Sequence, residues 1–121
     1  MSQEEIVRTA PPPAIRVVVV NWNRRDLLRA CLDSLAHQTH PSFEVVVVDN
    51  GSSDGSVEMV RGFMEYYPRP LVVIQNQENR GFCAANNQGF AGARNQFIAL
   101  LNNDAEAEPG WLEAMETAMR T

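Results

Sequence analysis

The residues best suited to chemistry follow an apolar segment near the end of the chain. Residues 97–101 (FIALL) predict a buried strand, and Asn102, Asn103 and Asp104 come directly after it. In an open α/β sheet, the carboxyl ends of the parallel strands form the ligand-binding edge. A carboxylate at that edge suits a hard divalent cation, and such a cation suits a phosphorylated ligand. Asp104 is therefore the candidate metal ligand.

A second acid and a set of amides are predicted to lie at the same edge. Asp49 ends another apolar segment, residues 43–48, and is followed by a polar turn. Of the ten asparagines in the chain, only Asn95 lies away from the four strand ends or the helix turns after them. Local turn chemistry explains isolated asparagines, but it explains the pairs at 86–87 and 102–103 less well. Amides donate and accept hydrogen bonds, as a base, a ribose or a sugar requires.

Strands and helices are predicted to alternate along the chain and so to position these residues. Apolar runs predict strands at residues 15–20, 43–48, 71–74 and 97–101, and helical spacing predicts a helix after each of them. Such βα units favour right-handed crossovers and a mostly parallel sheet with helices on both faces. The predicted fold class is α/β, with one domain over residues 15–121. Residues 1–14, which include three successive prolines, are predicted to form a flexible tail.

The helix ends also have predicted residues. Asn23 is the expected cap of the first helix, and Asp54 or Ser53 is the expected cap of the second. Pro109 suits the first position of the last helix. The third helix is rich in Ala and Gly, which lets it approach the sheet or a ligand closely.

Charge and composition exclude several partner classes. The net charge is −5 and the chain has no lysine, which argues against a nucleic-acid groove and an anionic membrane surface. No apolar run approaches the roughly 20 residues of a transmembrane helix. The first residues are acidic, unlike the start of a secretory leader.

Neither the cysteines nor the histidines point to a catalytic or metal site. Cys31 and Cys83 are too few for a disulfide framework, and we expect both to be reduced core residues. Reduced cysteines fit a cytoplasmic location, either in solution or at the inner face of the membrane. His37 and His40 lie in the connection to the second strand, at the opposite edge from the candidate site, and we expect both on the surface.

Other common α/β chemistries are absent from the sequence. The first turn, residues 21–26, holds no glycine and so lacks the dinucleotide-binding fingerprint. A P-loop and a phospho-accepting receiver domain both use a lysine, and the chain has none. A G-x-S-x-G nucleophile motif is also absent. What remains is a sheet edge that presents Asp49 and Asp104 among amides.

Five segments give the chain a resemblance to a known family. They are residues 17–24 (VVVVNWNR), 32–35 (LDSL) with 38–39 (QT), 45–56 (VVVVDNGSSDGS), 79–89 (NRGFCAANNQG), and 100–104 (LLNND) with 108–112 (EPGWL). In this order and spacing they resemble the nucleotide-binding, Rossmann-like half of a family 2 glycosyltransferase with the GT-A fold. The motifs NWN, DNGS and NND are most similar to those of the rhamnosyltransferase-like branch.

The resemblance implies inverting transfer of a sugar from a nucleotide-diphosphate sugar, a UDP- or dTDP-sugar, to a saccharide or lipid-linked saccharide acceptor. It implies Mn²⁺ or Mg²⁺ as cofactor, bound by Asp104 as the last residue of a D-x-D-type motif. Asn102 stands at the first position of that motif, which leaves one carboxylate. The family's general base lies in the acceptor-binding half, so we expect it beyond Thr121 and assign no catalytic residue here.

The resemblance also implies the residues that contact the nucleotide sugar. They are Asn21, Asn23, Asp49, Asn50, Ser52, Arg80, Asn86, Asn102 and Asn103. Arg24, Arg25 and Arg80 are candidates for phosphate contact, and Arg80 is preferred because it precedes a helix start.

Two other functions stay open at this point: a nucleotide-binding module without transfer activity, and a structural domain that keeps the fold. The presence of both Asp49 and Asp104 counts against the structural domain. If the acceptor-binding half is absent, we expect exposed apolar surface and self-association or marginal stability. Trp111, Met115 and Met119 on the last helix are the expected surface.

Overall fold

A parallel sheet forms the centre of residues 11–120, the part of the chain that the computed structural model describes. Its strands are β1 (Ile15–Asn21), β2 (Phe43–Asp49), β3 (Leu71–Gln75) and β4 (Phe97–Leu100), in the order β3-β2-β1-β4. The helices are α2 (Arg25–Ala36), α3 (Ser56–Met64), α4 (Phe82–Phe90) and α5 (Trp111–Arg120). The predicted α/β class with a parallel sheet is confirmed.

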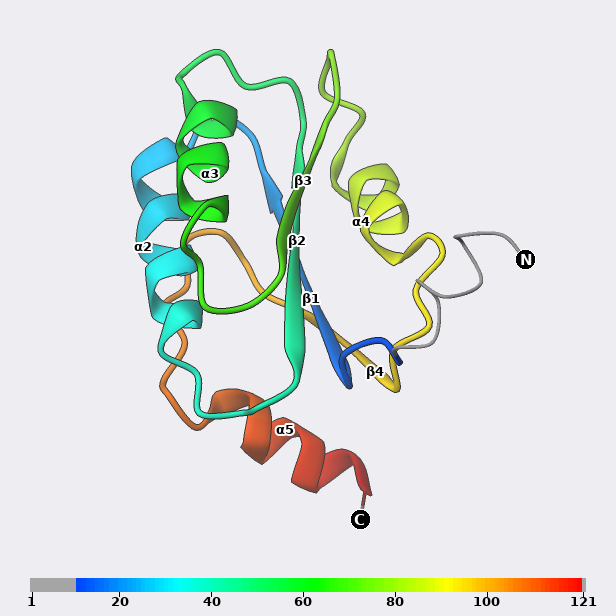
Figure 1. Ribbon diagram of the computed structural model, residues 1–121. Coiled ribbons are helices and arrows are strands. Elements are labelled where there is room, and N and C mark those ends of the chain that lie inside the picture. The colour runs from blue at the N-terminus through cyan, green and yellow to red at the C-terminus, as the bar shows by residue number, and fades with distance from the viewer. Residues whose placement is uncertain (1–10, 121) are drawn as a thin grey trace, which may run out of the picture.

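The helices cover the sheet unequally. Helices α2 and α3 lie on one face, α4 lies on the other, and α5 lies beside the edge where the strands begin (Figure 1). None of these helices is long and apolar enough to cross a bilayer. Of the predicted tail, residues 1–10 lie outside the described part, whereas Pro13 accepts a hydrogen bond from Asn95 Nδ2 at 2.8 Å.

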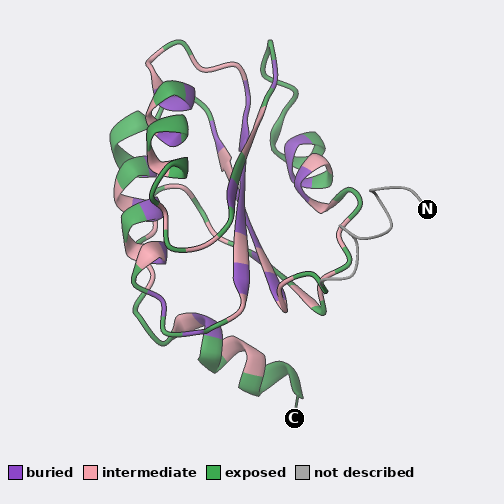
Figure 2. Ribbon diagram, viewed as in Figure 1, coloured by how far each residue is buried: buried purple, intermediate pink, exposed green. Residues whose placement is uncertain are grey.

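Alternating side chains of the strands bury into two separate cores. Val17 and Val19 of β1 pack with α2 and α3, and Val18 packs with α4, because successive strand residues point to opposite faces. Among the described residues, the α2 side has fourteen buried core residues and the α4 side has four. Buried positions therefore gather between the sheet and α2 and α3 (Figure 2).

Some apolar side chains of the outer strands are exposed on the face of the sheet that α4 covers only in part. Val72 of β3 and Ile98 and Leu100 of β4 are 48%, 37% and 50% exposed. The last helix differs from the prediction, because Trp111 and Met115 pack against the larger core and only Met119 is exposed. Exposed apolar side chains thus occur on the outer strands as well as at Met119, whereas most of the apolar face of α5 is packed.

Helix α4 packs unusually close to the centre of the sheet. A Cβ atom built on Gly89 would lie 2.4 Å from Cγ1 of Val18, which is closer than any real carbon contact. The Arg16 guanidinium of β1 also donates to the Gly89 carbonyl at 3.0 Å. The absence of a side chain at Gly89 is what allows this approach, as the small residues of this helix predicted.

The turn before α2 differs from its predicted form. Asn23 does not cap the helix: it has a positive φ of 49°, and its Oδ1 accepts from the N–H of Ser53. Asp54 instead accepts from the N–H of Arg25 at 2.9 Å and from that of Ser56 at 3.1 Å, so one carboxylate serves the first turns of α2 and α3. Burial raises the pKa of Asp54, but hydrogen bonds from the Ser56 hydroxyl and then from the N–H groups of Arg25 and Ser56 outweigh it and hold the pKa below its ordinary value.

Three further local predictions were wrong. His40 is buried, because α5 packs over it and Glu116 Oε1 lies 3.0 Å from its Nε2. Cys83 is exposed on α4, whereas Cys31 is buried as expected. Helix α5 begins at Trp111 rather than at Pro109. The first and third depend on contacts between segments far apart in the sequence, which local patterns do not contain.

We predict that Gly89→Ala destabilises the fold by about 1–3 kcal/mol, the usual cost of overpacking a core. Urea unfolding would measure the change. Gly62→Ala on α3 is the matched control, because nothing lies within 4 Å of a Cβ there. That substitution should stabilise the protein by up to about 1 kcal/mol through helix propensity. Equal stabilities for the two variants would contradict the close approach of α4.

Candidate functional site

The carboxyl ends of three strands meet at one level of the sheet. Asn21 at the end of β1 is in register with Asp49 at the end of β2, and Asp49 is in register with Gln75 of β3. The loop after β4 reaches the same edge, because Asn103 Nδ2 donates to Asn21 Oδ1 at 2.9 Å. The predicted ligand-binding edge is therefore built from all four strand ends.

The amide of Asn21 joins two of these loops. The side chain is 1% exposed, and its Nδ2 donates to Asp49 Oδ1 at 3.0 Å. Its Oδ1 accepts from Asn103 Nδ2 at 2.9 Å. Both ends of the amide are thus used inside the protein, and Asn21 ties the residue before Asp104 to the end of β2.

Asp49 is also fully engaged within the protein. Its Oδ1 accepts from Asn21 and from the Ser52 hydroxyl at 2.8 Å, and its Oδ2 accepts from the N–H of Ser52 at 2.9 Å. The Ser52 hydroxyl in turn accepts from the N–H of Asn23. This buried carboxylate holds the turn after β2 and, through it, the turn after β1.

Asn50 performs the corresponding task for the loop after β3. Its Oδ1 accepts from Asn76 Nδ2 at 3.0 Å and from the N–H of Arg80 at 3.2 Å. Its Nδ2 donates to the Gly81 carbonyl at 3.2 Å. The loop that leads into α4 is therefore fixed to the end of β2.

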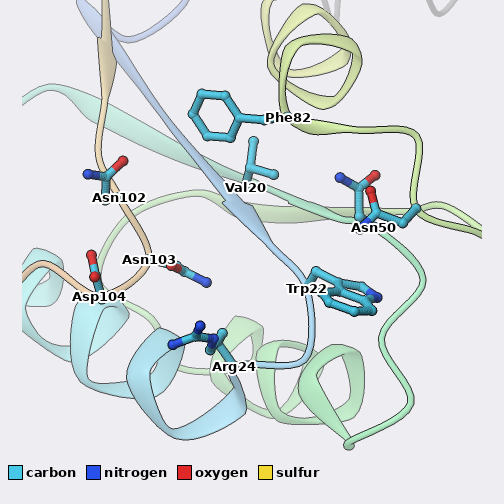
Figure 3. Close-up of a pocket in the computed structure, with 9 residues that line it drawn as sticks. Val20, Trp22, Arg24, Asn50, Phe82, Asn102, Asn103 and Asp104 are labelled. Atoms are coloured by element: carbon cyan, nitrogen blue, oxygen red, sulfur yellow. The ribbon is translucent and has the colours of Figure 1, made fainter.

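A pocket of about 370 Å³ opens above this network. Figure 3 shows Asn102, Asn103 and Asp104 on one side of it, and Trp22 and Asn50 on the other. The lining residues are Val20, Trp22, Arg24, Asn50, Asn79, Phe82, Asn102, Asn103 and Asp104. The pocket thus combines aromatic surface, amides, one guanidinium and one carboxylate.

The predicted site residues fall into three groups. Asn50, Asn102, Asn103 and Asp104 line the pocket. Asn21, Asn23, Asp49 and Ser52 lie in the hydrogen-bond network beside it. The side chains of Arg80 and Asn86 belong to neither group: that of Arg80 is exposed and only its backbone N–H joins the network, and Asn86 Nδ2 donates to the Phe82 carbonyl of its own helix at 3.2 Å.

Five lining residues were not among the predicted site residues: Val20, Trp22, Arg24, Asn79 and Phe82. Trp22 and Phe82 are 51% and 59% exposed, which is high for large aromatic side chains, and Arg24 lines the pocket where Arg80 does not. One signal was available for Trp22: it follows the last buried strand residue, where no core remains to receive an indole. An exposed aromatic face in a polar pocket suits a planar ligand.

Asp104 is placed to bind a cation together with a ligand. Its carboxylate is exposed in the pocket and makes no hydrogen bond or ion pair with residues 11–120. The same part of the chain holds no group of three His, Cys, Asp or Glu side chains that could hold a metal by itself. One carboxylate beside Asn102 and Asn103 suits Mg²⁺ or Mn²⁺, which are often held by one or two carboxylates plus phosphate oxygens.

The chain is similar to known proteins over most of its length. The sequence model described as Glycosyl transferase family 2 matches residues 16–121. Glycosyltransferase AglE from Haloferax volcanii is 34% identical over 107 residues, which are 87% of this chain and 35% of AglE.

Solved structures share the fold. S. aureus TarS 1-349 in complex with UDP has a TM-score of 0.78 and 27% identity, over 88% of this chain and 32% of that one. Mannosyltransferase PcManGT from Pyrobaculum calidifontis, in complex with GDP-Man and Mn²⁺, has a TM-score of 0.72 and 31% identity. The match covers 79% of this chain and 29% of PcManGT. The chain therefore spans about a third of the length of these proteins.

We predict that Asn21→Asp destabilises the protein more than Asn21→Ala does at neutral pH. The new carboxylate would face Asp49 across a 3.0 Å contact in a buried site, where two carboxylates resist being ionised together. We expect a loss of about 3–5 kcal/mol, against about 1–3 kcal/mol for Asn21→Ala.

The two variants differ in how their stability depends on pH. In the folded Asn21→Asp variant, the new carboxyl group holds its proton more strongly than it does in the unfolded chain, where a carboxyl pKa is about 3.9. The variant's loss of stability relative to wild type should grow as pH rises above about 4 and shrink below it. Urea unfolding between pH 4 and 8 measures both profiles, and parallel profiles would contradict the buried contact.

Proposed function

The chain belongs to glycosyl transferase family 2, and from that premise we propose that it binds the donor for sugar transfer from a nucleoside-diphosphate sugar to an acceptor hydroxyl. The observation that carries the proposal is the pocket at the carboxyl edge of the sheet. It places aromatic faces, amides, Arg24 and the exposed Asp104 around one volume. These are the groups that a base, a sugar and a diphosphate need in turn.

Each part of such a donor has chemically matched residues. The exposed rings of Trp22 and Phe82 offer faces on which a base can stack. The amides of Asn79 and Asn102 line the pocket and suit ribose or sugar hydroxyls. Arg24 supplies a cation for the diphosphate. In this proposal Asn21 and Asp49 shape the pocket from below rather than contacting the donor.

Asp104 is the residue that would hold Mn²⁺ or Mg²⁺, with Asn102 and Asn103 beside it. A bound divalent cation would neutralise negative charge on the departing diphosphate. Because the pocket offers one carboxylate, the diphosphate itself must complete the ligand set. We therefore expect the cation to bind weakly to the protein alone and more tightly with nucleotide. The Mn²⁺ in the complex of PcManGT with GDP-Man is consistent with this assignment.

The proposed transfer inverts the configuration at the anomeric carbon. The acceptor oxygen attacks that carbon from the side opposite the diphosphate, and a carboxylate base removes the hydroxyl proton. Asp104 is the only carboxylate that lines the pocket in the described chain, and it is assigned to the metal. The part of the mechanism that these residues perform is to bind and orient the donor and to favour diphosphate departure.

The donor base and sugar belong to the proposal as well. The wording of the sequence motifs favours a UDP- or dTDP-sugar and a rhamnosyltransferase-like enzyme. A second candidate, donor binding without transfer, is favoured for this chain alone because the pocket contains no second carboxylate to act as the base. Hydrolysis and transfer assays beside the binding measurements below would separate the two.

We predict that Mn²⁺ strengthens nucleoside-diphosphate binding at least about tenfold, a typical effect of intact metal coordination, and that Asp104→Ala removes this gain. Calorimetric titration of UDP, dTDP and GDP with and without Mn²⁺ measures it. Asn102→Asp is the opposite change: a second carboxylate should strengthen Mn²⁺ binding to the protein without nucleotide. Affinity that ignores both Mn²⁺ and Asp104→Ala would overturn the metal assignment.

We also predict that Trp22→Ala weakens nucleotide binding with and without metal. Loss of one stacked base contact costs about 1–3 kcal/mol, or roughly 5- to 150-fold in affinity. Trp22→Phe should recover part of the loss. Tyr66→Ala is the matched control, because Tyr66 is 76% exposed and does not line this pocket. Equal affinities for Trp22→Ala and Tyr66→Ala would rule out stacking on Trp22.

A further inference from the structure

Helix α2 lies beside the loop that carries Asp104. This loop, residues 101–110, leaves the carboxyl edge of the sheet and passes along α2 until α5 begins beside the opposite edge (Figure 1). The side chains of Asn102, Asp104, Glu106 and Glu108 are exposed. Much of the loop's own polar surface thus faces solvent, so its path depends largely on what holds its backbone.

Three side chains of α2 and the residues just after it hold that backbone. Cys31 Sγ lies 3.7 Å from the Asn102 carbonyl, and Ser34 Oγ accepts from the N–H of Ala107 at 3.0 Å. Gln38 makes two contacts: its Nε2 donates to the Glu108 carbonyl at 2.5 Å, and its Oε1 accepts from the N–H of Leu112 at 3.0 Å. These side chains therefore bind backbone carbonyls and N–H groups in turn along the loop and the start of α5.

The spacing and burial of these side chains fit one continuous contact line. Cys31 and Ser34 are three residues apart on α2, which places them on one face of that helix, and Gln38 follows two residues after the helix ends. Cys31 and Gln38 are buried, and Ser34 is half-buried. Both ends of the Gln38 amide are used. If the amide were flipped, its oxygen would face the Glu108 carbonyl and its NH₂ group would face the Leu112 N–H, and both hydrogen bonds would be lost.

The thiol of Cys31 is suited to its part. Burial first, and then the charges of Asp104 and Glu106, raise its pKa to about 12. The group therefore stays a protonated donor toward the Asn102 carbonyl at neutral pH. Ser34 is similarly complete, because its hydroxyl also donates to the Cys31 carbonyl at 2.7 Å.

We propose that Cys31, Ser34 and Gln38, which we call the α2 clamp, are positioning residues for Asp104. They fix the backbone two residues before Asp104 and three and four residues after it, while Asn103 is fixed by Asn21. The inference rests on the proposed metal role of Asp104. A site with a single protein carboxylate has no second acid to compensate when that carboxylate moves, so the outer contacts decide its affinity.

The test compares Ser34→Ala and Gln38→Met with two controls in the full chain. Each clamp variant removes the polar contacts but leaves a side chain of similar or smaller volume. Asp33→Ala changes the neighbouring exposed position of the same helix. Val60→Ala weakens the same large core from α3 without touching the loop, and so reports the effect of lower stability alone.

The first measurement needs neither metal nor nucleotide. Hydrogen exchange followed by NMR reports the Ala107 and Leu112 amides, which donate to Ser34 and Gln38. We expect exchange at least about tenfold faster for Ala107 in Ser34→Ala and for Leu112 in Gln38→Met. Asp33→Ala should leave both rates unchanged, and Val60→Ala should change them no more than other core amides. Unchanged rates in the clamp variants would overturn the inference.

The second measurement is UDP affinity with and without Mn²⁺. Both clamp variants should lose about tenfold or more of the Mn²⁺-dependent gain, as expected for contacts that orient a metal ligand, and keep their metal-free affinity. Ser34→Thr should recover the gain. In the Asp104→Ala background, Gln38→Met should have no further effect, because the residue acts through Asp104.

The outcomes separate the two proposals. A wild-type protein that binds none of UDP, dTDP and GDP, with or without Mn²⁺, would overturn the proposed function. Binding of these nucleotides without any Mn²⁺-dependent gain would overturn the metal assignment of Asp104 and, with it, this inference. A wild type that shows the gain, with clamp variants that keep it in full, would overturn the positioning role alone. Equal losses in Gln38→Met and Val60→Ala at equal unfolding free energy would also overturn it, because stability would then explain the effect.

Discussion

The buried amide of Asn21 is the contact on which the carboxyl edge of this sheet depends. Through one side chain, the end of β1 is joined to the carboxylate of Asp49 and to the amide of Asn103. A parallel sheet brings its strand ends to one edge, but it does not fix the loops that follow them. Here amide and carboxylate groups fix those loops, and each is satisfied inside the protein. A buried polar network of this kind is rigid when complete and costly when broken.

This arrangement separates shaping from binding. The most buried polar residues of the edge, Asn21, Asp49 and Asn50, use their polar atoms on one another, on loop side chains and on loop backbone. The exposed residues Trp22 and Asp104 are left to meet a ligand. A rigid lower layer and an exposed upper layer would suit the proposed role of holding a flexible, charged donor in one geometry. The same division appears around the loop after β4, whose backbone is held while its acidic side chains stay exposed.

Much of the fold was predictable because it is local in origin. Unbroken β-branched runs gave the strands, helical spacing of leucines gave α2, and glycines and prolines gave the breaks. Errors occurred where distant segments meet. His40 is buried because α5 packs over it. The same packing of α5 places Trp111 against the larger core. Asn23 is a turn residue rather than a cap because Ser52 and Ser53 bind it across 29 and 30 positions of sequence.

Residue types and their order along the chain were enough to predict the α/β class, the four loops at the carboxyl edge of the sheet, and the glycosyl transferase family 2 membership that the comparisons established. They also identified Asn50, Asn102, Asn103 and Asp104, which do line the pocket. The fold was needed to see that Asn21 and Asp49 lie in the network beside that pocket and that Trp22 and Arg24 line it. The physical reason is that residue type and spacing specify which atoms can donate, accept or bind a cation. Which partner each atom finds is decided only when the strands come into register and the loops close over their ends.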